Sequence, residues 1–78
     1  MQQKQPSNIR VCKRGDAYYC DVQGCFGGGF RGAFAGKTAE EAGLFAIALK
    51  ARYIDTNPLG GDMYLPAEVR EAIELAKV

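Results

Sequence analysis

The sequence predicts an α+β domain, in which an antiparallel sheet of three or four strands carries one main helix on one face, in the order β-β-β-α-β-α. Three observations predict it. Apolar and polar residues alternate before residue 37, a helix-capping motif begins at Thr38, and apolar residues then recur with a helical period. We expect residues 1–7 to be disordered and residues 8–78 to form a single domain. A chain of 78 residues buries only about 60% of its unfolded surface, so its core is thin.

The first two strands are predicted to form a hairpin. Ile9 and Val11 alternate with Arg10 and Cys12, and Gly15-Asp16 follows at a natural reversal point. The next segment, "AYYCDVQG", has the clearest alternation in the chain. We expect one face to carry Tyr18, Cys20 and Val22, and the other Tyr19, Asp21 and Gln23.

A third strand is predicted after the Gly27–Gly29 run, in "GFRGAFAG". Strict alternation would place Phe30 and Phe34 on one face with Gly32 between them, and Arg31, Ala33 and Ala35 on the other. A glycine inside a strand usually marks a bulge, a strong twist or the close approach of another backbone.

Thr38 is predicted to begin the main helix. Thr38-Ala39-Glu40-Glu41 is a capping box, in which the threonine oxygen accepts from the amide of Glu41 and the glutamate side chain reaches back. The expected core stripe is rich in alanine, which allows close packing on the sheet. Its members are Ala42, Phe45, Ala46, Leu49 and Tyr53.

The last part of the chain predicts a turn, a short strand and a second helix. Asn57-Pro58 and Gly60-Gly61 are turn residues, "MYL" is the expected fourth strand, and Pro66 suits the first turn of a helix. The apolar face of this helix is expected to hold Val69, Ala72, Ile73 and Ala76. Its solvent side is expected to hold Glu68, Glu71 and Glu74, an acidic row that is an alternative binding face through mimicry of phosphates.

Residues 27–38, "GGGFRGAFAGKT", partly match two nucleotide-binding motifs. A phosphate-binding loop needs four residues between its first glycine and the Gly-Lys pair, but only three separate Gly32 from Gly36. A dinucleotide motif at Gly27-x-Gly29-x-x-Gly32 should join a strand to a helix, whereas strand-like alternation continues after Gly32. We therefore expect a glycine-rich hairpin, with no bound cofactor.

The composition excludes most enzyme classes. The chain has no histidine, and its three cysteines (Cys12, Cys20 and Cys25) form neither a CxxC pair nor a closed disulfide set, so we expect reduced thiols, no metal site and no catalysis. No apolar run is long enough to span a membrane, and the polar N-terminus lacks a signal peptide, so we expect a cytoplasmic protein. Charge is uneven: residues 1–37 hold six basic and two acidic residues, and residues 38–78 hold four and seven.

The segment from "AYYCDVQG" to "FAIAL" resembles the second half of a double-stranded-RNA-binding domain. That family contacts phosphates with lysines at the start of the corresponding helix, where this chain has Thr38-Ala39-Glu40-Glu41. The resemblance implies related architecture and argues against binding RNA through this helix. A basic sheet face with Arg10, Tyr19 and Arg31 leaves nucleic-acid binding open as an alternative.

"YYCDVQGCF" and "KTAEEAG" are similar to two signatures of the HicB antitoxins, and this resemblance implies a protein that neutralises a small toxin. A resemblance to small phage anti-CRISPR proteins of the type I-F inhibitor kind covers more of the chain. Its pieces are the strand Tyr18–Val22, the glycine-bearing segment Gly27–Gly36, the alanine-rich helix Ala39–Ala51, the loop Asn57–Gly61 and the closing Leu65–Arg70. It implies a phage-encoded, non-enzymatic inhibitor that covers a surface of a CRISPR effector complex.

We predict that the protein, a monomer or homodimer, acts by presenting a surface to a protein partner. Tyrosine and arginine dominate the energetics of such surfaces. The expected partner-binding residues are Tyr19 and Arg31 on the outer sheet face, with Arg10 and Arg14 at its basic margin.

Overall fold

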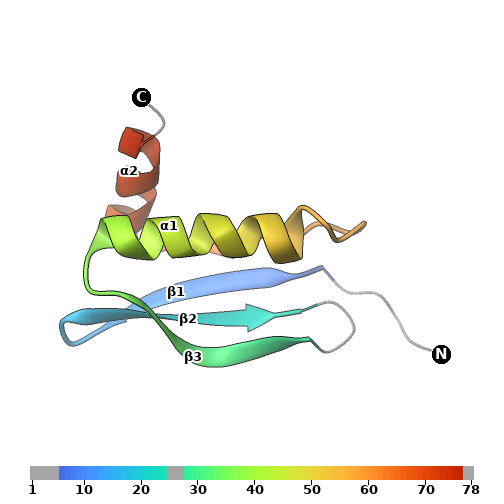
Figure 1. Ribbon diagram of the computed structural model, residues 1–78, viewed down its shortest axis with the longest axis horizontal. Helices are drawn as coiled ribbons and strands as arrows, with labels where there is room; N and C mark the ends of the chain where they lie inside the picture. The colour runs from blue at the N-terminus through green and yellow to red at the C-terminus, as the bar shows by residue number, and fades with distance from the viewer. Residues whose placement is uncertain (1–5, 25–27, 77–78) are drawn as a thin grey trace.

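The computed structural model of the protein describes residues 6–24 and 28–76, and it has the predicted order of elements (Figure 1). The elements are β1 (Asn8–Arg14), β2 (Ala17–Gln23), β3 (Gly29–Gly36), α1 (Ala39–Leu49), the π-helical segment η2 (Lys50–Ile54), β4 (Met63–Tyr64) and α2 (Ala67–Ala76). The α+β fold class is therefore confirmed.

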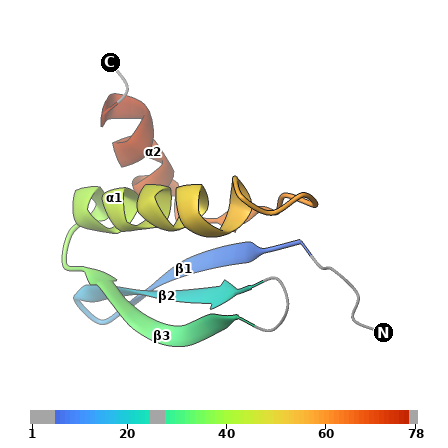
Figure 2. The same ribbon diagram turned by 45° about the vertical axis from the view of Figure 1, so that its right-hand side comes forward.

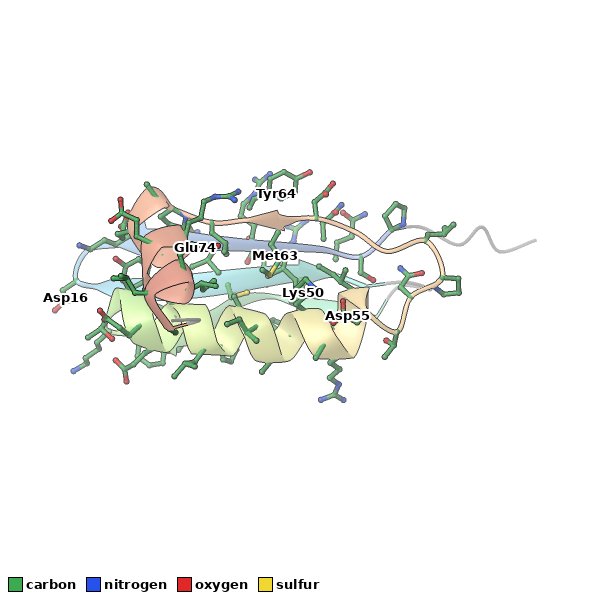
Figure 3. The ribbon with its side chains drawn as sticks, turned by 90° about the horizontal axis from the view of Figure 1, so that it is seen from above. Asp16, Lys50, Asp55, Met63, Tyr64 and Glu74 are labelled. Atoms are coloured by element: carbon green, nitrogen blue, oxygen red, sulfur yellow. The ribbon has the colours of Figure 1, made fainter. Side chains whose placement is uncertain are left out.

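The four strands form one sheet in the order β3-β2-β1-β4. β2 is antiparallel to both β1 and β3, as predicted, but β4 is parallel to β1, which corrects the expectation of a wholly antiparallel sheet. The reason is the path of the chain. Since α1 runs back along the sheet after β3, the strand that follows α1 has the direction of β1 (Figures 1 and 3).

The core lies between the sheet and α1, which crosses one face of it (Figures 1 and 2). The predicted inward residues of β1 and β2 are all buried: Ile9, Val11, Tyr18, Cys20 and Val22. From α1 the small residues Ala42 and Ala46 are fully buried, and Phe45, Leu49 and Tyr53 pack at the edge of the core. The predicted stripe is thus confirmed, although the helix widens into η2 from Lys50 onward.

The α2 helix packs on α1 rather than lying flat on the sheet (Figure 2). Its apolar face buries Val69 and Ile73. Gly43 of α1 makes this approach close, because a Cβ at that position would lie 3.0 Å from Cγ1 of Ile73.

The strand β3 departs from strict alternation, and the prediction that Phe30 and Phe34 share a face is wrong. Phe30 lies opposite the inward-facing Val22 and packs against the core, whereas Phe34 lies opposite the outward-facing Tyr19 and is 53% exposed. The register shifts between Cys20 and Val22, where β3 contains an extra residue. Gly32, with a φ of +67°, lies at this bulge, and one extra residue exchanges the two faces of the strand beyond it.

The N-terminal end of the described chain is attached to the loop before β4. Ser7 is completely buried; its amide donates to the carbonyl of Gly60 (2.9 Å), and its Oγ accepts from the side-chain amide of Asn57 (3.1 Å). Residues 1–5 of the segment predicted to be disordered lie outside the described residues.

Candidate functional site

The face of the sheet opposite α1 is covered by none of the described helices (Figures 1 and 2). We call it the open face. It carries the side chains that alternate with the buried residues of β1 and β2, together with their exposed register partners on β3 and β4. Its central residues are Arg10, Cys12, Tyr19, Asp21, Phe34 and Tyr64.

Aromatic residues form two contacts on the open face. The rings of Tyr19 and Phe34, which are register partners, meet edge to face with their centroids 6.0 Å apart and their planes at 79°. The guanidinium of Arg10 lies 5.6 Å from the ring centroid of Tyr64, its partner across the parallel pair. Tyr64 is 46% exposed, and in Figure 3 its side chain points outward from the sheet edge while that of Met63 points inward. An exposed arginine–aromatic pair beside a second aromatic pair is the chemistry of a contact surface.

The open face is basic. In the described strands Arg10 and Arg14 lie on this face and Arg31 is exposed in the edge strand β3, whereas Asp21 is the single acidic residue. Lys13 has the inward parity of Ile9 and Val11 and does not belong to this face. Asp21 is already used within the fold, because its Oδ1 accepts a hydrogen bond of 2.6 Å from the amide of Gly32 and so secures the bulge of β3. Glutamates gather instead on the helices, so the sheet layer attracts anions and the helical layer repels them.

The four residues predicted to bind a partner all lie in strands of the sheet. Arg10 and Tyr19 share the open face, and Arg14 is exposed at the hairpin end of β1. Arg31 is exposed beside the bulge in the edge strand β3.

Phe34 and Tyr64 extend this surface and were missed by the sequence-based prediction. Phe34 was assigned to the wrong face, and the one local signal of its true position was the glycine inside its strand. Tyr64 joins Arg10 through a pairing between distant segments, for which the sequence carries no local signal.

The glycine-rich segment is built into β3 and the start of α1. The amides of Lys37 and Thr38 both donate to Oε1 of Glu41, at 3.1 and 3.2 Å, and the amide of Glu41 donates to Oγ1 of Thr38 (3.1 Å). The predicted capping box is therefore confirmed. A carboxylate of the chain itself occupies amides that a phosphate-binding loop would offer to its ligand. Gly27 of the dinucleotide-like motif lies outside the described residues.

The buried thiol of Cys20 offers little chemistry at neutral pH. Burial, helped by the negative charge of Asp21, raises the pKa of Cys20 to about 11, which keeps this thiol protonated and unreactive. Cys12 is half-buried on the open face, and Cys25 lies outside the described residues. No group of three or more histidine, cysteine or acidic residues with the geometry of a metal site occurs in residues 6–24 and 28–76.

The first glutamate of the acidic row of α2, Glu68, is engaged within the fold. Oε2 of Glu68 accepts a hydrogen bond of 3.0 Å from the hydroxyl of Tyr18, which ties α2 to the sheet. The backbone amide of Glu68, and then this hydroxyl, hold the pKa of its carboxyl below the ordinary value. Burial, followed by the hydrogen bond to Glu68, raises the pKa of Tyr18.

This pair predicts opposite effects of Tyr18→Phe and Glu68→Gln on stability at the two ends of the pH scale. The lowered pKa of Glu68 contributes stability above the ordinary glutamate pKa of about 4.3, and this contribution is lost as the pH falls through the folded-state value. The raised pKa of Tyr18 contributes stability below about pH 10 and is lost above it. The free energy of unfolding is measured by urea titration at each pH from 3 to 11. In Glu68→Gln it should fall less steeply toward acid pH than in the unmodified protein. In Tyr18→Phe the free energy of unfolding should fall less steeply toward alkaline pH, while part of its decrease toward acid pH should remain. If both variants kept the pH dependence of the unmodified protein, the assignment would be contradicted.

Comparisons with family models, curated proteins and solved structures find no match to this chain. None of the described helices is both long and apolar enough to traverse a bilayer.

Proposed function

We propose that the protein is a non-enzymatic, protein-binding inhibitor that acts in the cytoplasm by pressing its open face against a partner. The single observation that carries the proposal is the combination of exposed Phe34 and Tyr64 with half-buried Tyr19 and exposed Arg10, on a sheet face that no described helix covers. Aromatic and arginine side chains are the usual energetic centres of protein interfaces.

The resemblance to small phage anti-CRISPR proteins supports a CRISPR effector complex as the partner. In this proposal the phage-encoded protein binds as a monomer or homodimer and occludes a working surface of the complex. The basic open face suits an acidic protein surface.

A purified type I-F CRISPR effector complex and the full-length protein provide the test. The double variant Tyr19→Ala/Phe34→Ala should weaken binding at least about 100-fold, since each interface hot spot contributes about 2 kcal/mol or more. Leu44→Ala/Leu75→Ala is the matched control, because both leucines are exposed (65% and 75%) but lie on the helices. Affinity is measured by biolayer interferometry and inhibition by a plaque assay on a CRISPR-positive host.

The outcomes separate the candidate partners. If the protein neither binds the complex nor restores plaques, the CRISPR proposal is wrong. Stoichiometric binding to a co-encoded small toxin, lost in the same double variant, would identify an antitoxin that uses the open face. If the control variant lost as much binding affinity as the double variant, the open face would not be the binding surface.

Single-stranded nucleic acid is the second candidate partner, favoured by the same exposed rings beside basic residues. Bases stack on aromatic side chains of open sheets, and phosphates pair with neighbouring arginines. Binding to an oligonucleotide that falls steeply between 50 and 200 mM salt, as is typical of phosphate contacts, would favour this candidate over a protein partner.

A further inference from the structure

The strand β1 is paired along only part of its outer edge. It pairs with β2 over all seven of its residues, but with β4 only at Ile9 and Arg10. Among the described residues, no strand pairs with this edge from Val11 to Arg14. β4 cannot extend the pairing, because Pro66 follows Leu65 and lacks the N–H that the ladder would need.

The unpaired backbone groups can be identified from the strand geometry. The amide of Ile9 donates to the carbonyl of Asp62 (2.9 Å), so the backbone groups of Ile9 point toward the β4 side. Alternate residues of a strand direct their backbone groups to the same neighbour. The backbone groups of Val11 and Lys13 therefore also point to this edge, and those of Lys13 lie beyond the end of β4.

A hollow lies along this unpaired edge. It is open to solvent, has a volume of about 450 Å³, and is bounded by β1 on one side and by the segment from β4 to α2 on the other. Its lining residues are Arg10, Val11, Cys12, Lys13, Tyr64, Leu65, Pro66 and Arg70. Three of these are cationic and none is acidic.

The cations flank the edge from two directions. Arg10 lies on the open face, whereas Arg70 comes from α2, where its guanidinium donates to the carbonyl of Met63 (3.4 Å). Lys13 lies between them, with its Nζ 5.8 Å from the ring centroid of Tyr18. A second copy of this chain is a poor occupant, because antiparallel pairing of two β1 edges would bring like charges together.

We propose that this edge of β1 receives an extended, acidic segment of a protein partner as an added strand, with its backbone paired to Lys13 and its carboxylates beside Arg10, Lys13 and Arg70. Addition of a strand to an exposed sheet edge is an established mode of peptide recognition, in which main-chain hydrogen bonds supply affinity and the flanking side chains supply specificity. The inference deepens the proposed function and rests on there being a protein partner. Its test needs only this protein and a synthetic peptide.

The probe is the blocked peptide Glu-Val-Glu-Val-Glu, titrated into the ¹⁵N-labelled full-length protein. We expect the amide of Lys13 to exchange with solvent about fivefold or more slowly at saturation, as for one new backbone hydrogen bond. The Lys-Val-Lys-Val-Lys peptide should not bind. The glutamate peptide with N-methyl groups on alternate amides should bind at least about fivefold more weakly, because methylation removes its hydrogen-bond donors.

Variants of the protein separate backbone pairing from charge. Lys13→Ala removes the cation, while Lys13→Pro removes both the cation and the outward N–H, at a position where proline leaves the pairing with β2 intact. Lys13→Pro should bind the peptide at least about fivefold more weakly than Lys13→Ala. Arg70→Glu should weaken binding about tenfold, whereas Arg52→Glu, which reverses an exposed cation on η2, should not change it.

Three results would overturn the proposal: no binding of the glutamate peptide at millimolar concentration, equal affinity of the N-methylated peptide, or exchange protection of Lys13 that grows with protein concentration alone. The last result would assign the edge to a second copy. Tyr19 and Phe34 do not line the hollow. The peptide experiment can therefore fail without affecting the test of the open face, and it can still be interpreted if the open-face test fails.

Discussion

Gly36→Ala is expected to lower the free energy of unfolding by about 3 to 5 kcal/mol, the sum of backbone strain and overpacking. This loss is comparable to the whole stability of so small a domain, so the variant should be largely unfolded before urea is added. Gly36 has a φ of +147°, a conformation that side chains rarely adopt. A Cβ at this position would lie 2.5 Å from Cβ of Glu41, on the first turn of α1. Relief would require α1 to move away from β3, which would open the core.

Gly32→Ala is the matched control, measured alongside in urea titrations followed by circular dichroism. Gly32 also has a positive φ, of +67°, but no atom beyond its chain neighbours lies within 4 Å of a Cβ built there. It should lose only about 1 to 2 kcal/mol, the cost of the left-handed conformation. If the two variants were equally stable, close contact with α1 would not be the reason for Gly36.

Ile9→Ala is expected to leave the protein largely unfolded at 37 °C. Ile9 is completely buried in a central strand, and removal of such a side chain costs about 2 to 5 kcal/mol. A core of this size supplies only about 3 to 5 kcal/mol of net stability, so the loss is comparable to the whole. The expected observation is collapse of amide dispersion in a ¹⁵N correlation spectrum, with a thermal transition at or below 37 °C.

The control for Ile9 is Ile47→Ala, the same substitution on the solvent side of α1. Ile47 is 39% exposed, and its truncation should cost less than about 1 kcal/mol. Similar losses in the two variants would mean that the core does not centre on the sheet–helix contact.

The parts of the fold that are predicted correctly are those that short-range sequence patterns determine. The inward faces of β1 and β2 follow from alternation alone, and the start of α1 follows from Thr38 and Glu41. The faces of β3 could not be predicted in this way, because the bulge at Gly32 changes the parity of the strand. The widening of α1 into η2 likewise has no local signature.

The candidate site was predicted in part for the same reason. Arg10 and Tyr19 were identified because both belong to regularly alternating strands. The prediction puts Phe34 on the wrong face, because strict alternation takes no account of the bulge in β3. Tyr64 required the parallel pairing of β1 with β4, which depends on the path of the whole chain rather than on neighbouring residues.

The parallel pairing of β1 with β4 also governs when this protein can fold. The outer neighbour of β1 is the penultimate element, and Val69 and Ile73 of the final helix complete the core. A nascent chain that still lacks these elements exposes a sheet edge and part of its apolar interior, and such distant pairings form slowly. We therefore expect the fold to form only after β4 and α2 have been synthesised, with the unfinished chain depending on holdase chaperones in the interval.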